Sequence, residues 1–304
     1  MQKTQIKQLA ARIAGTQIKP ANERVKTIVD RLLLDLFITI DDLDIKPEEF
    51  WTALTYVTDL GKSNEAALLA AGLGIEHYFD LRLDEKEREV GIDPGTTPRT
   101  IEGPLYVAGA PVNHGEARID DDTDEGEILF MDGQVKDASG KPIPGAVVEV
   151  WHANTLGNYS FFDNSQSDFN LRRTIIADAE GRYRFRSIMP SGYGCPPDGP
   201  TQHLLDLLGR HGRRPAHVHF MVSAPGYRQL TTQINIKGDA YTYDDFAFAT
   251  RDELIPEVVH HADPAELRDH GVNRPFTTIT FDFALPKAVE GIPATLIDRP
   301  RVKA

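Results

Sequence analysis

Residues 126–137, GEILFMDGQVKD, decide the fold that we expect for this chain. The stretch is a short run of apolar and aromatic residues, and it is followed by the Gly- and Pro-rich turn DASGKPIPG (137–145). Runs of this kind, with side chains alternating between two faces, are typical of β-strands. Six similar runs lie between residues 103 and 285: GPLYVAGAP, GAVVEVWHAN, GRYRFRSIMP, AHVHFMVSA, LTTQINIKG and FTTITFDFAL. Many short strands separated by turns predict an antiparallel β-sandwich. One helical turn is expected within this region, because Thr250-Arg-Asp-Glu253 fits a capping box.

Upstream of about residue 100 the periodicity is that of helices. Apolar side chains recur there at three- and four-residue steps, which predicts an amphipathic helix: Val25, Ile28, Val29, Leu32, Leu33, Leu36 and Ile40. Pro47 followed by two glutamates predicts the start of another helix, and Ser63 is the expected N-cap of a third. The stretch GIDPGTTPRT (91–100) reads as a linker, so we expect a helical domain over 1–100 and a β domain over 101–304.

The composition restricts the classes of partner. The 304 residues carry a formal net charge of −13 and contain no run of Lys or Arg, which argues against nucleic-acid binding. The N-terminal residues lack the apolar segment of a signal peptide, and no stretch has the ~18 apolar residues of a membrane span. The single cysteine, Cys195, has no partner for an internal disulfide and fits a reducing compartment. We therefore expect a cytoplasmic protein, with a structural role for Cys195.

Two histidines in one expected strand are the first sign of chemistry. His217 and His219 are two residues apart, so in a strand both imidazoles lie on the same face and can bind one metal ion. The alternative is a pair of histidines that merely share a solvated face, because so short a motif also occurs by chance. Arg214 just before them adds a fixed positive charge, which an anionic ligand or intermediate would need.

Two tyrosines occupy unusual loops. Tyr193 lies in PSGYGCPP (190–197), where glycines flank it and prolines follow, so that a stiff turn can hold the side chain at a fixed point. Tyr159 lies in GNYSFF (157–162), after the run that ends in Trp151 and His152. Either tyrosine could equally be an aromatic residue that packs beneath its loop, and the residues alone leave both interpretations open.

Longer segments give a specific resemblance. They are WHANTLGNYSFFD, FNLRRTIIAD, PSGYGCPPDGPTQHLLDLLGRHGRRPAHVHF and LTTQINIKGDAYTYDDFAFATR. Together they resemble intradiol ring-cleaving dioxygenases, in particular the branch that acts on catechol. The resemblance is nearly continuous from about residue 100 to 304, and it extends upstream through LLAAGLGIEHYFDL and TPRTIEGPLYVAGAP.

The resemblance implies a mononuclear non-haem Fe(III) site, one per subunit. Tyr159 and Tyr193 would be phenolate ligands and His217 and His219 imidazole ligands, with Tyr193 leaving the metal when the substrate binds. Phenolate is a hard anionic donor, which suits the trivalent ion. Arg214 would stabilise negative charge on the reacting ring, with Gln233 as a polar partner. The reaction would be cleavage of catechol by O2 to cis,cis-muconate, a step of aromatic compound catabolism through the β-ketoadipate pathway.

The resemblance also suggests which residues surround the substrate, although core packing explains most of these apolar positions equally well. They are Leu69, Ile101, Pro104, Leu105, Phe246 and Ala247, together with Arg214. The string GPLYVAG (103–109) is more similar to enzymes for unsubstituted catechol than to the chlorocatechol or hydroxyquinol branches.

The resemblance implies a mainly β fold in which a prealbumin-like antiparallel sandwich is the catalytic domain. The N-terminal domain would be a helical linker that pairs two subunits and can enclose a bound lipid, and the wide apolar surface of residues 32–37 fits that role. Two alternatives differ in kind. Residues 133–140 and 178–185 also resemble prealbumin-like binding modules that do no chemistry, and a lone H-x-H could serve a zinc or cupin-like site.

Overall fold

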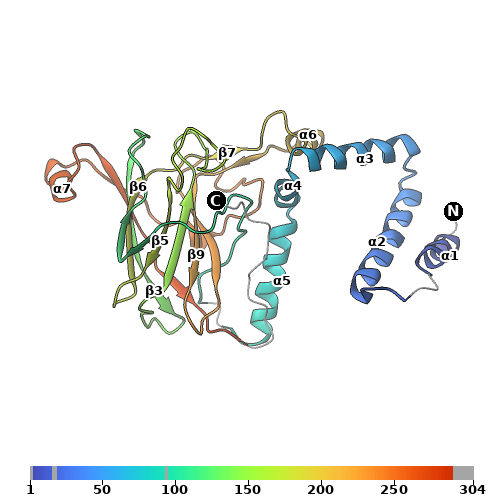
Figure 1. Cartoon of the computed structure of the whole chain (residues 1–304), viewed down its shortest axis with the longest axis horizontal. Coiled ribbons are helices and arrows are strands. Elements are labelled where there is room, and N and C mark those ends of the chain that lie inside the picture. The colour runs from blue at the N-terminus through green and yellow to red at the C-terminus, as the bar shows by residue number, and fades with distance from the viewer. Residues whose placement is uncertain (1–2, 16–18, 93–94, 290–304) are drawn as a thin grey trace. The chain divides into compact units, whose positions relative to one another are not determined.

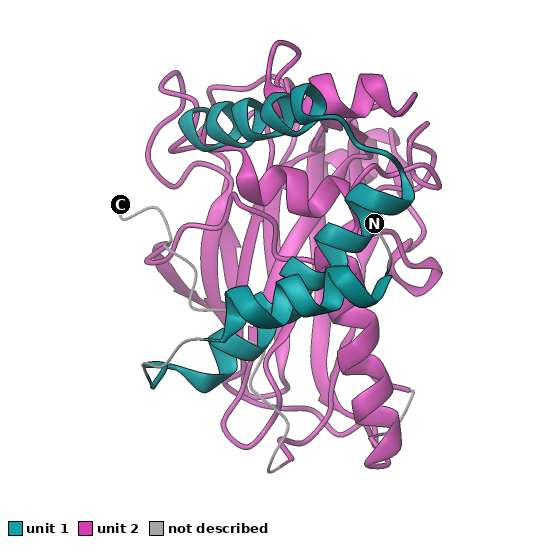
Figure 2. Ribbon diagram, turned by 90° about the vertical axis from the view of Figure 1, so that its right-hand side faces the viewer, with its two compact units in different colours: residues 1–63 teal, residues 64–304 magenta. Residues whose placement is uncertain are grey.

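The computed structural model describes residues 3–15, 19–92 and 95–289. The chain separates into two compact units, Met1–Ser63 and Asn64–Ala304, which Figures 1 and 2 display. The domain boundary that we expect near residue 100 falls later than this division, and it remains a prediction.

The described residues of the first unit form three helices, α1 (Lys3–Ala14), α2 (Glu23–Asp42) and α3 (Pro47–Lys62). The predicted start at Pro47 is confirmed, and the Lys46 backbone N–H donates to Glu49 Oε2 at 2.8 Å. The predicted apolar stripe lies on α2, where Leu32 is 63% exposed and no residue is buried. No helix of the described ranges has the length and apolar character needed to cross a membrane.

The second unit begins with α4 (Ala66–Gly72) and α5 (Ile75–Glu89) and continues into two main sheets. The first sheet has the strand order β1 (Val112–His114), β5 (Arg172–Ile176), β4 (Val147–His152), β9 (His217–Ser223) and β10 (Leu230–Asn235). The second has the order β11 (Val259–His261), β12 (Phe276–Thr280), β3 (Ile128–Asp137), β6 (Arg182–Ile188) and β2 (Glu116–Arg118), and β13 (Phe283–Leu285) also pairs with β3. The short elements are β7 (Tyr193–Gly194), β8 (Arg213–Arg214), α6 (Pro200–Leu207), a 3₁₀ turn (Asp252–Leu254) and α7 (Pro264–Asp269).

Both sheets contribute side chains to one hydrophobic core. Met131 and Phe185 come from the second sheet, Val148 and Phe220 from the first, and all four are fully buried. Because successive residues of a strand point to opposite faces, the core positions Val218 and Phe220 leave His217 and His219 on the other face of β9. The core therefore determines on which side of the sheet the two histidines lie.

The prediction of antiparallel pairing is correct for some strand pairs, among them β4 with β5 and β9, but not for all. Four strand pairs in the described part of the chain are parallel: β1 with β5, β2 with β6, and β3 with both β12 and β13. These partners are far apart in the sequence, so long connections let the chain return in the same direction. Residue periodicity reports which face a side chain occupies and carries no information about strand direction.

Two predicted helix caps were also wrong. Ser63 is the C-cap of α3, whereas α4 has Glu65 at its N-cap. The 3₁₀ turn has Arg251 rather than Thr250 at its N-cap, without a side-chain capping bond. Thr250 instead accepts a hydrogen bond from Asn235 Nδ2 at 3.3 Å, so its hydroxyl is engaged with β10.

Helix α5 runs beside the strands of the second unit (Figure 1) and is anchored by ion pairs. Arg99 is 2% exposed and contacts both Asp84, at 2.7 Å, and Glu87. Arg228 Nε lies 3.0 Å from the carboxylate of Glu87, and Arg251 pairs with Asp84. These pairs fix the helix that follows α4, and α4 itself carries Leu69 and Gly72.

Candidate metal centre

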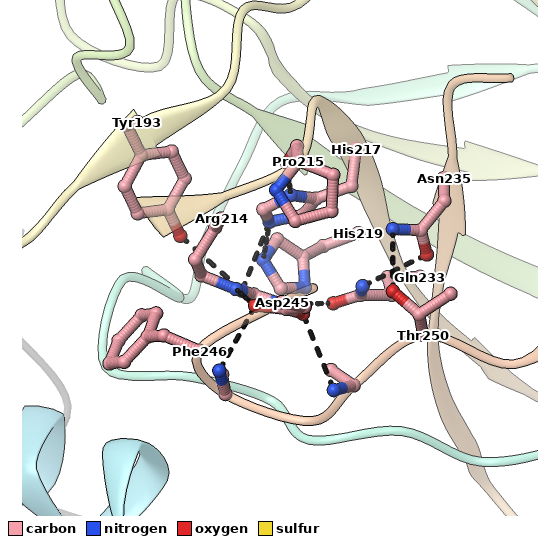
Figure 3. A network of polar contacts seen from close by, with 12 residues as sticks. Tyr193, Arg214, Pro215, His217, His219, Gln233, Asn235, Asp245, Phe246 and Thr250 are labelled. Atoms are coloured by element: carbon pink, nitrogen blue, oxygen red, sulfur yellow. Dashed lines mark hydrogen bonds and ion pairs between the residues drawn. The ribbon is translucent and has the colours of Figure 1, made fainter. Parts of the chain in front are cut away.

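Three short segments bring the four candidate ligands together. His217 and His219 lie at the start of β9, and Tyr193 lies on β7, where it is paired in register with Arg214 of β8 (Figure 3). Tyr159 lies in the loop after β4, and its ring is 5.6 Å from that of Tyr193, at an interplanar angle of 87°. Gly157, with φ +81°, allows this approach, since a Cβ there would lie 2.7 Å from the Cβ of Tyr193.

The two imidazoles point their Nε2 atoms at each other, 3.0 Å apart. His217 Nδ1 lies 2.6 Å from the Pro215 carbonyl, which can only accept, so Nδ1 carries the proton and Nε2 keeps a lone pair. The ring of His219 stacks on Trp151 with centroids 4.9 Å apart and planes within 3°. Burial, and next the charge of Arg214, lower the pKa of His217 to about 3, and burial lowers the pKa of His219 well below its ordinary value. Both rings are therefore neutral, the state in which imidazole binds metals.

The Tyr159 hydroxyl is buried and forms no hydrogen bond with any described residue. Burial, and next the neighbouring Tyr193, raise the pKa of Tyr159 well above its ordinary value. A phenolate at this position therefore requires a nearby cation. The Tyr193 hydroxyl is better connected, because it accepts a hydrogen bond of 3.4 Å from Arg214 Nη1.

Arg214 is the hub of the polar network in Figure 3. Its Nη1 group also lies 3.1 Å from His217 Nε2, and its Nη2 group donates to Gln233 Oε1 at 2.7 Å. Gln233 Nε2 donates in turn to Asn235 Oδ1 at 3.1 Å. The guanidinium thus lies beside the candidate ligands, and β10 holds it there.

Asp245 is a residue of this network that the sequence analysis missed. It accepts from Arg214 Nε at 3.1 Å and from Nη2 at 3.0 Å. Burial alone would raise the pKa of Asp245, but the charge of Arg214 holds it below its ordinary value. The carboxylate also accepts from the backbone N–H groups of Ala247 and Ala249. The sequence offered one sign of its role. Asp245 lies in the largely apolar segment YDDFAFA (243–249), where an acidic residue is expected to be buried and could pair with a buried arginine.

The structure brings together some of the expected pocket residues and not others. Ile101, Phe246 and Ala247 share one buried cluster with Ala71, Leu205, Ala249 and Cys195. Leu105 packs on a second cluster that contains Trp151 and Tyr159. Leu69 is half-buried and Pro104 is exposed, and neither belongs to these clusters. Burial raises the pKa of the Cys195 thiol to about 12, which fits the structural role expected for it.

The donor set fits a trivalent metal. Across the described residues, no group of three or more His, Cys, Asp or Glu side chains is arranged to hold a metal ion. The side chains of Tyr159 and Tyr193 lie beside the two histidines and are the candidate oxygen donors. Two nitrogens bound at right angles to one ion, with bonds of about 2.1 Å, lie about 3 Å apart, which is the observed separation. Two neutral nitrogens with two phenolate oxygens form a hard, anionic set that favours a trivalent ion.

Comparisons with known proteins identify the family to which the chain belongs. The family model described as Dioxygenase matches residues 101–287, and the model described as Catechol dioxygenase N terminus matches residues 22–91. The chain is 62% identical over 258 residues to catechol 1,2-dioxygenase 2 of Acinetobacter lwoffii, covering 85% of this chain and 94% of that protein. The structure of Acinetobacter radioresistens catechol 1,2 dioxygenase superposes with a TM-score of 0.96 at 55% identity, covering 100% of this chain and 99% of that one. A chlorocatechol 1,2-dioxygenase of Cupriavidus pinatubonensis is 35% identical over 245 residues, covering 78% of this chain and 90% of that protein.

Proposed function

Because this chain belongs to the intradiol ring-cleaving dioxygenase family, we propose that it splits the ring of catechol with O2 to give cis,cis-muconate. The bond between the two hydroxyl-bearing carbons breaks, and each of these carbons becomes a carboxyl carbon, so both oxygen atoms of O2 enter the product. The observation that carries the proposal is the pair of buried neutral imidazoles, with Nε2 atoms 3.0 Å apart, beside two tyrosines.

The cofactor in this proposal is one Fe(III) ion per subunit, held by Tyr159, Tyr193, His217 and His219. Ferric iron, when bound, would draw electron density from a catechol whose two oxygens it chelates and so make the ring reactive towards O2. Zinc or a cupin-like site is less suitable, because two phenolate donors match the charge of a trivalent ion.

The tyrosines would have different roles. Catechol must lose two protons to bind through both oxygens, and hydroxide would take one of them and the Tyr193 oxygen the other. Its hydroxyl already lies 3.4 Å from Arg214 Nη1, so a donor is present when the tyrosine moves. Tyr159 is fully buried and would remain a ligand throughout.

Arg214 would stabilise the negative charge that develops on the ring. Its guanidinium is held from one side by Asp245 and from another by Gln233, which leaves Nη1 directed at the candidate ligands. A preorganised cation of this kind stabilises a charged transition state without having to reorient. Gln233 therefore acts mainly by fixing the orientation of Arg214.

We favour catechol over chlorocatechols and hydroxyquinol as the substrate. Identity to the catechol enzyme of Acinetobacter lwoffii is 62%, against 35% for the chlorocatechol enzyme. The buried cluster of Ile101, Phe246 and Ala247 would contact the planar ring, with Leu69, Pro104 and Leu105 completing the pocket. Family membership disfavours the alternative of a prealbumin-like module that binds without chemistry.

The assembly that we propose is a cytoplasmic homodimer formed through the helical domain of residues 1–100, with residues 101–304 as a prealbumin-like β-sandwich. Exposed apolar side chains on α2, among them Val25, Val29 and Leu32, support a buried interface or a bound lipid. A single buried thiol, Cys195, is compatible with a reducing compartment.

The test is to load the purified protein with ferric iron and follow its colour and its product. A visible tyrosinate-to-iron band is expected that shifts when catechol is added, together with the absorbance of muconate. Tyr193→Phe should weaken the band and the turnover, and metal analysis should find iron rather than zinc. A loaded protein that is colourless and does not consume catechol would refute the proposal.

A further inference from the structure

Arg172 is a buried cation without a carboxylate partner. It lies on β5, opposite Trp151 of β4, and is 1% exposed. Its Nε group donates to Ser160 Oγ at 2.9 Å and its Nη2 group to the Ser160 carbonyl at 3.2 Å, whereas Nη1 has no hydrogen bond. No carboxylate in the described ranges forms an ion pair with it. Burial lowers the pKa of Arg172 to about 10, so the side chain is still charged at neutral pH.

The other strongly buried arginines of this unit are paired. Arg214 faces Asp245, and both Arg99 and Arg228 face Glu87. A buried charge without a partner costs several kcal/mol, so its presence needs an explanation. Arg172 faces two aromatic rings instead, with its Cζ atom 5.7 Å from the ring centre of Tyr159 and 5.9 Å from that of Phe161. Phe161 cannot carry a charge, whereas Tyr159 is a candidate anionic ligand.

We propose that Arg172 is a positioning residue for this reaction, whose positive charge balances the negative charge that Tyr159 carries as a ligand of ferric iron. The inference rests on the proposed function. A cation over an aromatic ring stabilises its π electrons, and the attraction is stronger when the ring is anionic and the site is dry. Ser160, the residue after Tyr159, holds the guanidinium against this ring through both its side chain and its carbonyl.

The two arginines differ in their counterions. Arg214 approaches Tyr193 and is paired with Asp245, whereas no carboxylate of the described residues pairs with Arg172. The unpaired charge of Arg172 therefore lies over the ring of Tyr159, where the proposal requires it.

The experiment compares Arg172→Gln, Arg172→Lys and the control Arg173→Gln, each loaded with ferric iron. Arg173 is the next residue of β5, points to the other face and donates to the Arg118 carbonyl. In Arg172→Gln the Tyr159 phenolate loses the stabilisation by a nearby positive charge, so the energy of its donor electrons rises. The charge transfer from tyrosinate to iron then needs less energy, and its band moves to longer wavelength. Iron affinity should fall roughly 10- to 100-fold, as for other partners of metal ligands. Arg172→Lys keeps the charge and should keep most of the band position, and Arg173→Gln should match the unmodified protein.

The inference is overturned if folded Arg172→Gln has the unmodified band and iron affinity, or if Arg172→Lys shifts as far as Arg172→Gln. If Arg172→Gln does not fold, Ser160→Ala replaces it, because it removes the hydroxyl that holds Nε and should shift the band in the same direction by less. An unshifted band in Ser160→Ala then refutes the inference. The proposed function fails separately, when the unmodified protein loaded with iron has no tyrosinate band and leaves catechol intact.

Discussion

Arg214 and Asp245 form a two-pronged ion pair, Nε to Oδ1 at 3.1 Å and Nη2 to Oδ2 at 3.0 Å, in which the side chains are 4% and 1% exposed. Two further contacts depend on this pair. The third guanidinium nitrogen, Nη1, is left to face Tyr193 and His217, and the carboxylate holds the backbone of Ala247 and Ala249. The pair therefore connects the candidate ligands to the loop that carries Phe246.

Asp245→Asn should destabilise the fold, because it leaves Arg214 charged, buried and unpaired. Removing one partner of a buried ion pair costs roughly 3–5 kcal/mol. Urea unfolding at pH 7 measures the loss. Asp244→Asn is the matched control, since the Asp244 side chain is 77% exposed and its change should stay within about 0.5 kcal/mol. Equal losses in the two variants would contradict the importance of the pair.

Arg214→Lys should preserve iron binding and slow the reaction. An ammonium group cannot reproduce the planar fork that contacts Asp245, Gln233 and His217 together. Loss of a preorganised donor lowers turnover by about 100-fold or more, which steady-state assays of muconate formation can measure alongside iron content per subunit. The exposed neighbour supplies the control, Arg213→Lys, for which near-normal turnover is expected.

Strand periodicity predicts the positions of His217 and His219, because β9 keeps its core residues Val218 and Phe220 at alternate positions. Their role as ligands remains a prediction. Tyr159 and Tyr193 lie in loops, where no periodicity constrains direction, so they could be proposed only through the resemblance of the surrounding segments. Asp245 was missed for a related reason: its partner Arg214 is 31 residues away, and the pairing depends on how two loops meet.

The errors in strand direction and capping have a common physical origin. Strand direction and helix capping both depend on which group, often distant in the sequence, forms the hydrogen bond. A local sequence pattern does not report that partner. Thr250 has the residue type of an N-cap, yet its hydroxyl bonds to Asn235 on β10. Similarly, the residues of β3 and β12 give no local sign that the two strands run parallel, since their pairing joins segments about 150 residues apart.

Asp80 should make stability depend on pH. Burial raises the pKa of its carboxyl to about 7 in the folded protein, against 3.8 for an aspartate exposed to water. Between these values the folded state binds the extra proton, so the contribution of Asp80 to stability is greatest below about pH 4, falls as pH rises, and stays lower above about pH 7.

Asp80→Asn should remove that decrease and make the protein more stable at pH 8, by at most about 4 kcal/mol. Urea unfolding at pH 5 and pH 8 would show it as a smaller difference between the two midpoints. Glu85→Gln on the exposed side of α5 changes the same net charge and should leave the difference unaltered. If both variants lose the pH dependence equally, the net charge of the protein is responsible for it, and the burial of the Asp80 carboxyl is not.

Gly72→Ala should reduce the space for the substrate, because it displaces Phe246 in the buried cluster beside the proposed pocket. A Cβ at this position would lie 3.0 Å from Phe246 Cε2 and 3.1 Å from Cδ2, so the phenyl ring must move by a few tenths of an ångström. Because Phe246 packs with Ile101 and Ala247, we expect kcat/KM to fall more for 4-substituted catechols than for catechol, by roughly 10-fold, the effect of about one methylene in an apolar pocket.

The control is Gly61→Ala in α3, where an added Cβ meets nothing within 4 Å. Alanine favours a helix over glycine by about 1 kcal/mol at either position, so any common gain in stability belongs to the helix and not to the pocket. A change in substrate preference that Gly72→Ala shows and Gly61→Ala lacks would place Phe246 against the substrate. Identical preference in both variants would mean that the Phe246 ring moves away from the ring of catechol, and that this cluster supports the pocket without contacting its ligand.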